Sequence, residues 1–107
     1  MSDYLQVITT TEKKHDAEAI ARMLVEKRLA ACVQIVGPVT SVYRWQGQIE
    51  TAEEFQVIAK SRRNLFARIE QAIGEAHPYD VPEILAVPVD DGSRAYLAWM
   101  DGEVGQA

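Results

Sequence analysis

Two side chains of this sequence could bind a transition-metal ion. Cys32 lies in the apolar run AACVQIV, where a thiolate would be a soft ligand for Cu(I) or Zn(II) and a thiol would simply be buried. His77 precedes Pro78 and is expected at a helix end, with a ring nitrogen facing solvent or its charge held by the helix dipole. One chain offers too few ligands for a closed site, so weak binding is expected, with Asp80 and Glu83 of another copy as further donors.

A basic cluster suggests a different chemistry. Lys60, Arg62 and Arg63 flank Ser61, which is expected to open a helix. Cations are unfavourable beside the positive end of a helix dipole, unless an anion lies between the helix amides and the guanidinium groups. The cluster is therefore a candidate anion or effector site. The preferred interpretation is neutralisation by Glu53, Glu54 or a neighbouring subunit, because surface charge pairing is common.

Three aromatic residues are candidates for an interface. Tyr43 and Trp45 lead into an expected hairpin tip, and Tyr79 follows the second helix. Exposed aromatic side chains at a hairpin tip favour aggregation in a monomer, so contact with another subunit is the preferred interpretation. The alternative is a ligand pocket lined by Trp45 and Tyr79.

A catalytic site has little support in the sequence. The chain has no nucleophile elbow, no Gly-rich phosphate loop and no zinc-protease helix motif. His77 and Asp80 could form an acid–base pair, but no nucleophile is placed near them. We therefore expect a protein that is not an enzyme.

These residues are positioned by elements that the hydrophobic pattern predicts. Residues 4–10 (YLQVITT) are rich in β-forming residues and indicate a buried strand. An amphipathic helix follows, and Thr10 and Thr11 are available as caps near its start. Its apolar stripe comprises Ala17, Ile20, Ala21, Leu24, Val25 and Leu29.

A long hairpin is predicted in the middle of the chain. Residues 30–45 form a strand pattern that Gly37-Pro38 interrupts, which indicates a bend or bulge because proline cannot donate to a strand ladder. Gln46-Gly47 is a turn signal, and the returning strand ends in EEFQVIAK. Both arms exceed the average strand length of about 5–6 residues.

The last part of the chain predicts a second helix and a final strand. The helix opens at Ser61 and ends near His77, and its stripe comprises Leu65, Ile69, Ala72, Ile73 and Ala76. Residues 83–89 form a strand in which Pro88 suggests an edge, and residues 94–100 form a short helix before a loose tail. The order β-α-β-β-α-β predicts an α+β, ferredoxin-like fold with a short C-terminal addition. Its open sheet face and long hairpin require a partner subunit.

Composition limits the classes of protein that this chain can be. Its 107 residues are close to the size of one domain, with a core from about residue 4 to residue 100. The formal net charge of −5 disfavours binding to nucleic acid or to an anionic membrane surface. The sequence shows no signal peptide and no run of about 18 apolar residues. A single cysteine cannot form an intrachain disulfide, so a cytoplasmic location is the default expectation.

Four sequence blocks together resemble the CutA family of divalent-cation tolerance proteins. They are KRLAAC (27–32), SVYRWQG (41–47), HPYDVPEI (77–84) and YLAW (96–99), and their order and spacing match the family pattern. The resemblance implies a ferredoxin-like homotrimer linked to divalent-cation tolerance, which binds copper or similar ions and is not a catalyst. Some members carry Cys and His where this chain has Thr9 and Ala76, so His77 alone remains of that metal set.

The trimeric ferredoxin-like architecture implies a second function class. PII-type signalling proteins share that architecture, so the chain could bind a small anionic effector in clefts between subunits. Lys60, Arg62 and Arg63 would then contact the effector. The chain lacks the long nucleotide-binding loop of those regulators.

Overall fold

The computed structural model describes residues 3–105 and shows a mixed α+β fold with an antiparallel sheet. Four strands lie in the order β2-β3-β1-β4, so the long hairpin forms one edge and the shortest strand forms the other. The elements are β1 (Tyr4–Thr11), α1 (Lys14–Glu26), β2 (Cys32–Trp45), β3 (Gln48–Arg62), the 3-10 turn η1 (Arg63–Leu65), α2 (Phe66–Ala76), β4 (Leu85–Pro88) and α3 (Arg94–Glu103).

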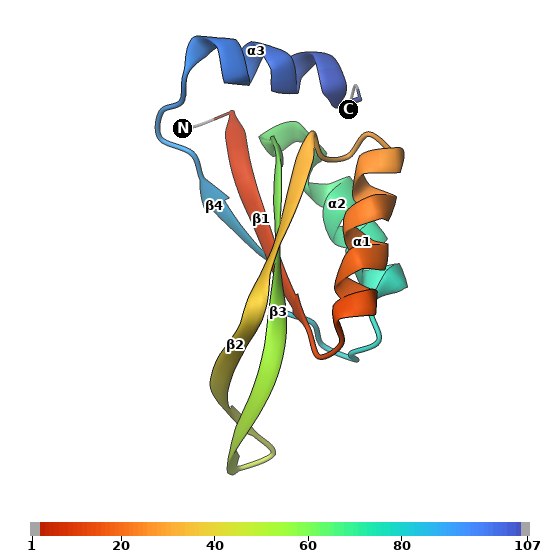
Figure 1. Ribbon diagram of the computed structural model, residues 1–107, viewed down its shortest axis with the longest axis vertical. Coiled ribbons are helices and arrows are strands. Elements are labelled where there is room, and N and C mark those ends of the chain that lie inside the picture. The colour runs from red at the N-terminus through yellow and green to blue at the C-terminus, as the bar shows by residue number, and fades with distance from the viewer. Residues whose placement is uncertain (1–2, 106–107) are drawn as a thin grey trace.

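The core lies between one face of the sheet and the helices α1 and α2, which lie on the same side in Figure 1. Alternate residues of β1 and β3 point to these helices, because side chains of a strand alternate between the two sheet faces. The predicted stripes supply most of the helical core, but Val25 and Ala76 are exposed. The largest apolar side chains that are almost completely buried are Leu5, Ile20, Leu24, Leu65, Ile69, Ile73, Val7 and Val57.

The predicted hairpin is confirmed, and it extends beyond the helical layer at one end of the molecule (Figure 1). Its register shifts between Val36 and Val39, so the irregularity predicted at Gly37-Pro38 is also confirmed. A Cβ atom at Gly37 would lie 2.7 Å from the Phe55 ring, which explains why glycine is needed there. The turn places Gln46 and Gly47 at positive φ, a conformation that glycine adopts without strain.

The boundary predicted at Ser61 is wrong. β3 continues to Arg62, and α2 begins only at Phe66 after the 3-10 turn. Ser61 is fully buried, and its hydroxyl donates a 2.6 Å hydrogen bond to the Leu29 carbonyl oxygen. β3 pairs with β1 as far as Tyr4↔Arg62, and this long-range pairing outweighs the local preference of serine for a helix start.

The predicted threonine caps and the length of the last strand also need correction. β1 extends to Thr11, whose hydroxyl donates to the Lys13 carbonyl oxygen, and α1 has no side-chain cap. The last strand covers Leu85–Pro88 rather than 83–89, and it lies at the sheet edge as Pro88 suggested. No helix of residues 3–105 is long and apolar enough to cross a membrane.

The C-terminal segment is not a loose tail over residues 101–105. α3 continues to Glu103, Val104 is buried, and the Gly105 amide donates to the Arg28 carbonyl oxygen. The Arg28 side chain donates to the carbonyl oxygens of Gly102 and Glu103, which are the unpaired acceptors at a helix end. The prediction for residues 106–107 lies outside the described residues.

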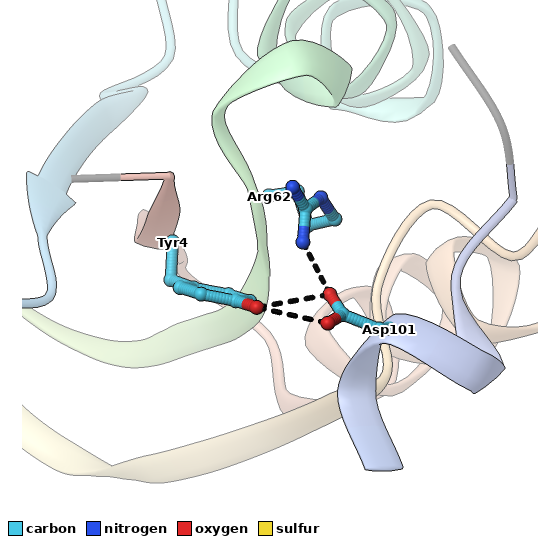
Figure 2. A network of polar contacts seen from close by, with 3 residues as sticks. All are labelled: Tyr4, Arg62 and Asp101. Atoms are coloured by element: carbon cyan, nitrogen blue, oxygen red, sulfur yellow. Dashed lines mark hydrogen bonds and ion pairs between the residues drawn. The ribbon is translucent and has the colours of Figure 1, made fainter. Parts of the chain in front are cut away.

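A polar cluster fixes α3 to the sheet (Figure 2). The Tyr4 hydroxyl donates to both carboxylate oxygens of Asp101, at 2.9 and 3.1 Å. Arg62 forms an ion pair with the same carboxylate, and its guanidinium lies 4.9 Å from the centre of the Tyr4 ring. Tyr4, Arg62 and Asp101 are called the clasp below. The clasp joins the first strand, the end of the hairpin and the last helix.

Candidate functional site

A cleft of about 550 Å³ lies between the hairpin and the loop that follows α2. Its volume falls within the range of small-molecule sites, about 300–1,000 Å³. The hairpin supplies one wall and the loop 77–84 supplies the other. The lining residues are Thr10, Ser41, Val42, Tyr43, Trp45, Glu54, Tyr79, Asp80, Val81 and Glu83.

The hairpin wall of the cleft is aromatic and accessible. Tyr43 is 44% exposed and Trp45 is 49% exposed, and both face the cleft from β2. Alternation along a strand places residues 41, 43 and 45 on one side, and Val42 also lines this wall although it lies on the other side of β2. Two aromatic side chains of the single chain are therefore accessible from the cleft.

The floor of the cleft carries a buried carboxylate. Glu54 is only 8% exposed, and its Oε2 accepts a 2.8 Å hydrogen bond from the Tyr79 hydroxyl. Burial and this hydrogen bond raise the pKa of Tyr79 well above its usual value, and the nearby charge of Glu12 adds to the effect. Tyr79 therefore stays protonated and remains a donor to Glu54.

The loop wall adds two more acidic side chains, Asp80 and Glu83. Partial burial raises the pKa of Glu83 above its ordinary value, and the neighbouring Glu54 carboxylate raises it further. Among residues 3–105, no lysine, arginine or histidine lines the cleft. The carboxylates of the cleft thus lie together without a cationic side chain in its lining.

A smaller acidic hollow adjoins the cleft. It has a volume of about 450 Å³ and shares Tyr43 and Tyr79 with the cleft. Its other lining residues are Glu12, Ala52 and Glu53. Acidic side chains therefore line both of the spaces that Tyr79 borders.

His77 holds the loop wall in place instead of offering a free nitrogen. The residue is 8% exposed, and its Nδ1 accepts a hydrogen bond from the Tyr79 amide at 3.1 Å. Since Nδ1 accepts, the ring proton of the neutral imidazole is on Nε2, which donates to the Thr10 carbonyl oxygen at 2.7 Å. The expectation of a solvent-facing nitrogen is wrong, because both nitrogens are used by the backbone.

Cys32 lies elsewhere on the sheet. It pairs with Lys60 in the ladder, whereas the Thr10 carbonyl that binds His77 lies beside Gln56, four residues away along β3. Cys32 is only partly buried. Burial raises the pKa of Tyr96 in α3, and the nearby Cys32 side chain raises it further. Within residues 3–105 no group of three or more His, Cys, Asp or Glu side chains could hold a metal ion. The structure does not bring Cys32 and His77 together.

The basic cluster is also divided. Lys60 and Arg62 belong to β3 rather than to a helix start, so the amides of a helix N-terminus do not lie beside them. Lys60 donates to the Gln34 side chain at 2.6 Å, and Arg62 belongs to the clasp. Arg63 begins η1, a turn of three residues. The geometry therefore gives no support to an anion site built from these three residues.

The prediction from sequence found part of the cleft. A ligand pocket lined by Trp45 and Tyr79 was the alternative to an interface, and both residues line the cleft. The buried Glu54 was missed as a site residue. Its signal is the pair Glu53-Glu54, which in a strand must place one carboxylate on each face of the sheet.

Comparisons with known proteins agree over most of the chain. The family model described as CutA1 divalent ion tolerance protein matches residues 5–103. The divalent-cation tolerance protein CutA of Thermus thermophilus is 41% identical over 99 residues, which cover 92% of this chain and 96% of that protein. Human protein CutA is 42% identical over 84 residues, which cover 78% of this chain and 47% of that protein. The crystal structure of CutA1 from Oryza sativa superposes with a TM-score of 0.95 at 32% identity, covering 99% of this chain and 97% of that one.

Proposed function

The chain belongs to the CutA1 divalent ion tolerance family, and from this we propose that it acts in divalent-cation tolerance as a non-catalytic homotrimer that binds such ions weakly. The observation that carries the metal-binding part is the acidic cleft. Glu54, Asp80 and Glu83 lie in one cleft without a basic side chain in its lining. Such a negative field raises the local concentration of cations.

The metal proposal rests on carboxylates rather than on His77 and Cys32. Carboxylate oxygens bind divalent ions without strong selectivity. Affinity for divalent first-row transition-metal ions then generally rises from manganese to copper and is lower again for zinc. The described residues of one chain contain no group of three metal-binding side chains. The site is therefore open and weak, unless a second subunit adds donors.

A calorimetric titration with CuCl2 tests this metal site. Glu83→Gln removes one carboxylate of the cleft, and we expect Cu²⁺ to bind several-fold more weakly because a direct charge contact is lost. Glu70→Gln, at an exposed position of α2, is the matched control with the same change of charge. Equal affinity in wild type and Glu83→Gln, or an equal loss in both variants, would exclude the cleft as the metal site.

The trimer proposal rests on apolar side chains that one chain leaves in solvent. They occur on the hairpin, on β4 and on α3, far more widely than a single ligand site requires. The β-α-β-β-α-β order and the strand order β2-β3-β1-β4 support a ferredoxin-like subunit, whose open sheet face could pack against other copies. The exposed large side chains of these three elements are Val36, Val42, Tyr43, Trp45, Ile49, Leu85, Val87, Tyr96 and Trp99.

Sedimentation equilibrium measures the assembly directly. We expect a species of three times the 12.0 kDa chain mass at micromolar concentration. Val87→Glu, at the exposed edge strand, is expected to weaken the assembly, since a charge in an apolar interface lacks a partner. A stable monomer of the wild-type chain would contradict the homotrimer.

A further inference from the structure

Arg28 has a backbone conformation that arginine rarely adopts. It follows α1 with a φ of 59°, in the left-handed region that favours glycine. The Arg28 amide donates to the Val25 carbonyl oxygen at 3.0 Å. The Leu29 amide donates to the Leu24 carbonyl oxygen at 2.9 Å. These two hydrogen bonds form a Schellman motif, in which the residue at the position of Arg28 is usually glycine. Glycine would therefore end α1 better than arginine does.

The Arg28 side chain accounts for this departure, because it binds the end of another helix. Its Nε donates to the Glu103 carbonyl oxygen at 2.9 Å, and its Nη2 donates to the Gly102 carbonyl oxygen at 2.8 Å. The Arg28 carbonyl oxygen accepts from the Gly105 amide at 2.7 Å. A guanidinium fork suits two adjacent acceptors, and its charge is favourable at the negative end of a helix dipole. Arg28, Gly102, Glu103 and Gly105 are called the latch below.

The latch lies at the end of α3 where other contacts also hold this helix. Met100 and Val104 are buried in the core, and Asp101 belongs to the clasp. α3 crosses the end of the sheet, and its C-terminal end lies near the end of α1 (Figure 1). Tyr96 and Trp99 precede this anchored end and form a ring pair with centroids 5.5 Å apart. The orientation of these two rings therefore depends on how the end of α3 is held.

We propose that Arg28 is a positioning residue for assembly: the latch fixes α3 so that Tyr96 and Trp99 are presented to a second copy of the chain. This inference rests on the homotrimer proposed above, in which these two rings belong to the surface that contacts other copies. It adds a polar residue that is not among the apolar side chains of that surface. The contact with α3 offsets the unfavourable backbone conformation of Arg28.

Arg28→Gly separates the two roles of this residue. Glycine maintains or improves the end of α1, but it removes the side-chain hydrogen bonds to α3. The Val104 amide, which donates to the Met100 carbonyl oxygen, should lose protection from hydrogen exchange about tenfold, because charged hydrogen bonds are lost at an exposed site. The Leu29 amide should keep or increase its protection. Amide hydrogen exchange of the full chain, followed by NMR, measures both protection factors.

Two further variants control for the backbone and for the charge. Arg28→Asn should reproduce the result of Arg28→Gly, because asparagine also tolerates the left-handed conformation and lacks the guanidinium group. Lys27→Gln is the matched control, since it removes the same charge from the exposed neighbouring residue. It should leave the protection of α3 unchanged. Equal losses of protection in Lys27→Gln and Arg28→Gly would assign the effect to net charge and would contradict the latch.

Sedimentation velocity in a series of urea concentrations measures the consequence for assembly. The trimer of Arg28→Gly should dissociate at a lower urea concentration than the wild-type trimer, and the trimer of Lys27→Gln should not. Unchanged protection of α3 in Arg28→Gly, or an equal fall in protection throughout the chain, would overturn the latch. Equal resistance of both trimers to urea would overturn the role in assembly. A monomeric wild-type chain would reject the homotrimer as well, whereas a trimeric wild type with an unaffected Arg28→Gly variant rejects this inference alone.

Discussion

Two tyrosine–carboxylate hydrogen bonds lie near opposite ends of β1. They differ in whether a basic side chain is paired with the carboxylate. In the clasp, Tyr4 donates to Asp101, and Arg62 forms an ion pair with that carboxylate (Figure 2). In the cleft, Tyr79 donates to Glu54, and no basic side chain of the described part of the chain lines the same space. The clasp is electrostatically complete within one chain, whereas the cleft has acidic groups in excess.

The difference separates a structural contact from a proposed binding site. A carboxylate that is paired within the chain fixes elements to each other, and here it attaches α3 to the end of the sheet. A group of carboxylates without a counter-ion costs free energy, because burial and mutual repulsion both oppose the charged forms. That cost would fall if a cation entered, and this is the physical basis of the cation binding proposed for the cleft.

Loss of the His77 side chain should give the largest decrease in stability. It should disturb the loop at the cleft and leave the clasp intact. His77→Ala removes two hydrogen bonds to buried backbone groups, at Thr10 and Tyr79, and should lower the free energy of unfolding by about 2–3 kcal/mol. Urea unfolding at a fixed protein concentration measures the change. His15→Ala, at a residue with an exposed side chain, should change stability by less than about 0.5 kcal/mol. Equal losses in the two variants would show that His77 does not position the loop.

Substitutions in the clasp should lower the free energy of unfolding by a smaller amount, and the effects of Arg62 and Asp101 should be coupled. Arg62→Met and Asp101→Asn each break the ion pair, so both should lower stability, and the double variant should lose less than the sum of the two. The pair is partly exposed, and we expect a coupling energy of about 1 kcal/mol. A double-variant cycle by urea unfolding provides that value. Strictly additive losses would show that Arg62 and Asp101 do not stabilise each other, so the clasp carboxylate would not be compensated as proposed here.

Glu54→Gln should change the free energy of unfolding in the opposite direction to Asp101→Asn. The amide oxygen of glutamine can still accept from the Tyr79 hydroxyl, while the repulsion with Glu83 disappears. The free energy of unfolding should therefore rise by roughly 0.5 kcal/mol in the absence of a ligand. The same variant should lose affinity for a cation. A loss of stability as large as that of Asp101→Asn would mean that Glu54 is paired as completely as Asp101.

The smallest expected effect is a delayed ionisation of Tyr79. Burial and the hydrogen bond to Glu54 raise its pKa above the usual value of about 10. The folded state holds this proton more tightly than the unfolded state, so the stabilisation is complete below about pH 10 and is lost as the pH rises further. Ultraviolet absorbance should show late-ionising tyrosine in the wild type, and Tyr79→Phe should remove part of it. Tyr96, whose pKa burial also raises, should still ionise late in that variant.

Local pattern was a good guide where one element determines its own structure. The helical stripes, the long hairpin and the irregularity at Gly37-Pro38 follow from the spacing of apolar residues and from backbone chemistry. The pattern failed at Ser61, because the end of β3 is determined by pairing with β1. The anion interpretation of Lys60, Arg62 and Arg63 lost its premise with it, since it assumed a helix start at Ser61.

Site residues were predictable only in part, for a related reason. Trp45 and Tyr79 could be recognised as exposed aromatic residues next to turn signals. Their meeting in one cleft depends on how the hairpin packs relative to the loop after α2, which no local pattern describes. His77 shows the same limit, because residue type suggested a metal ligand and long-range hydrogen bonds made it a structural residue.

The amino-acid sequence by itself determined the element types, the long hairpin and the membership of the CutA1 family, because these depend on residue spacing and on motifs within short segments. Only the tertiary structure decided which charges are compensated. Asp101 meets Arg62 across 39 positions of sequence, and Glu54 meets Tyr79 across 25. Electrostatic energy depends on distance in space and on burial, and folding sets both.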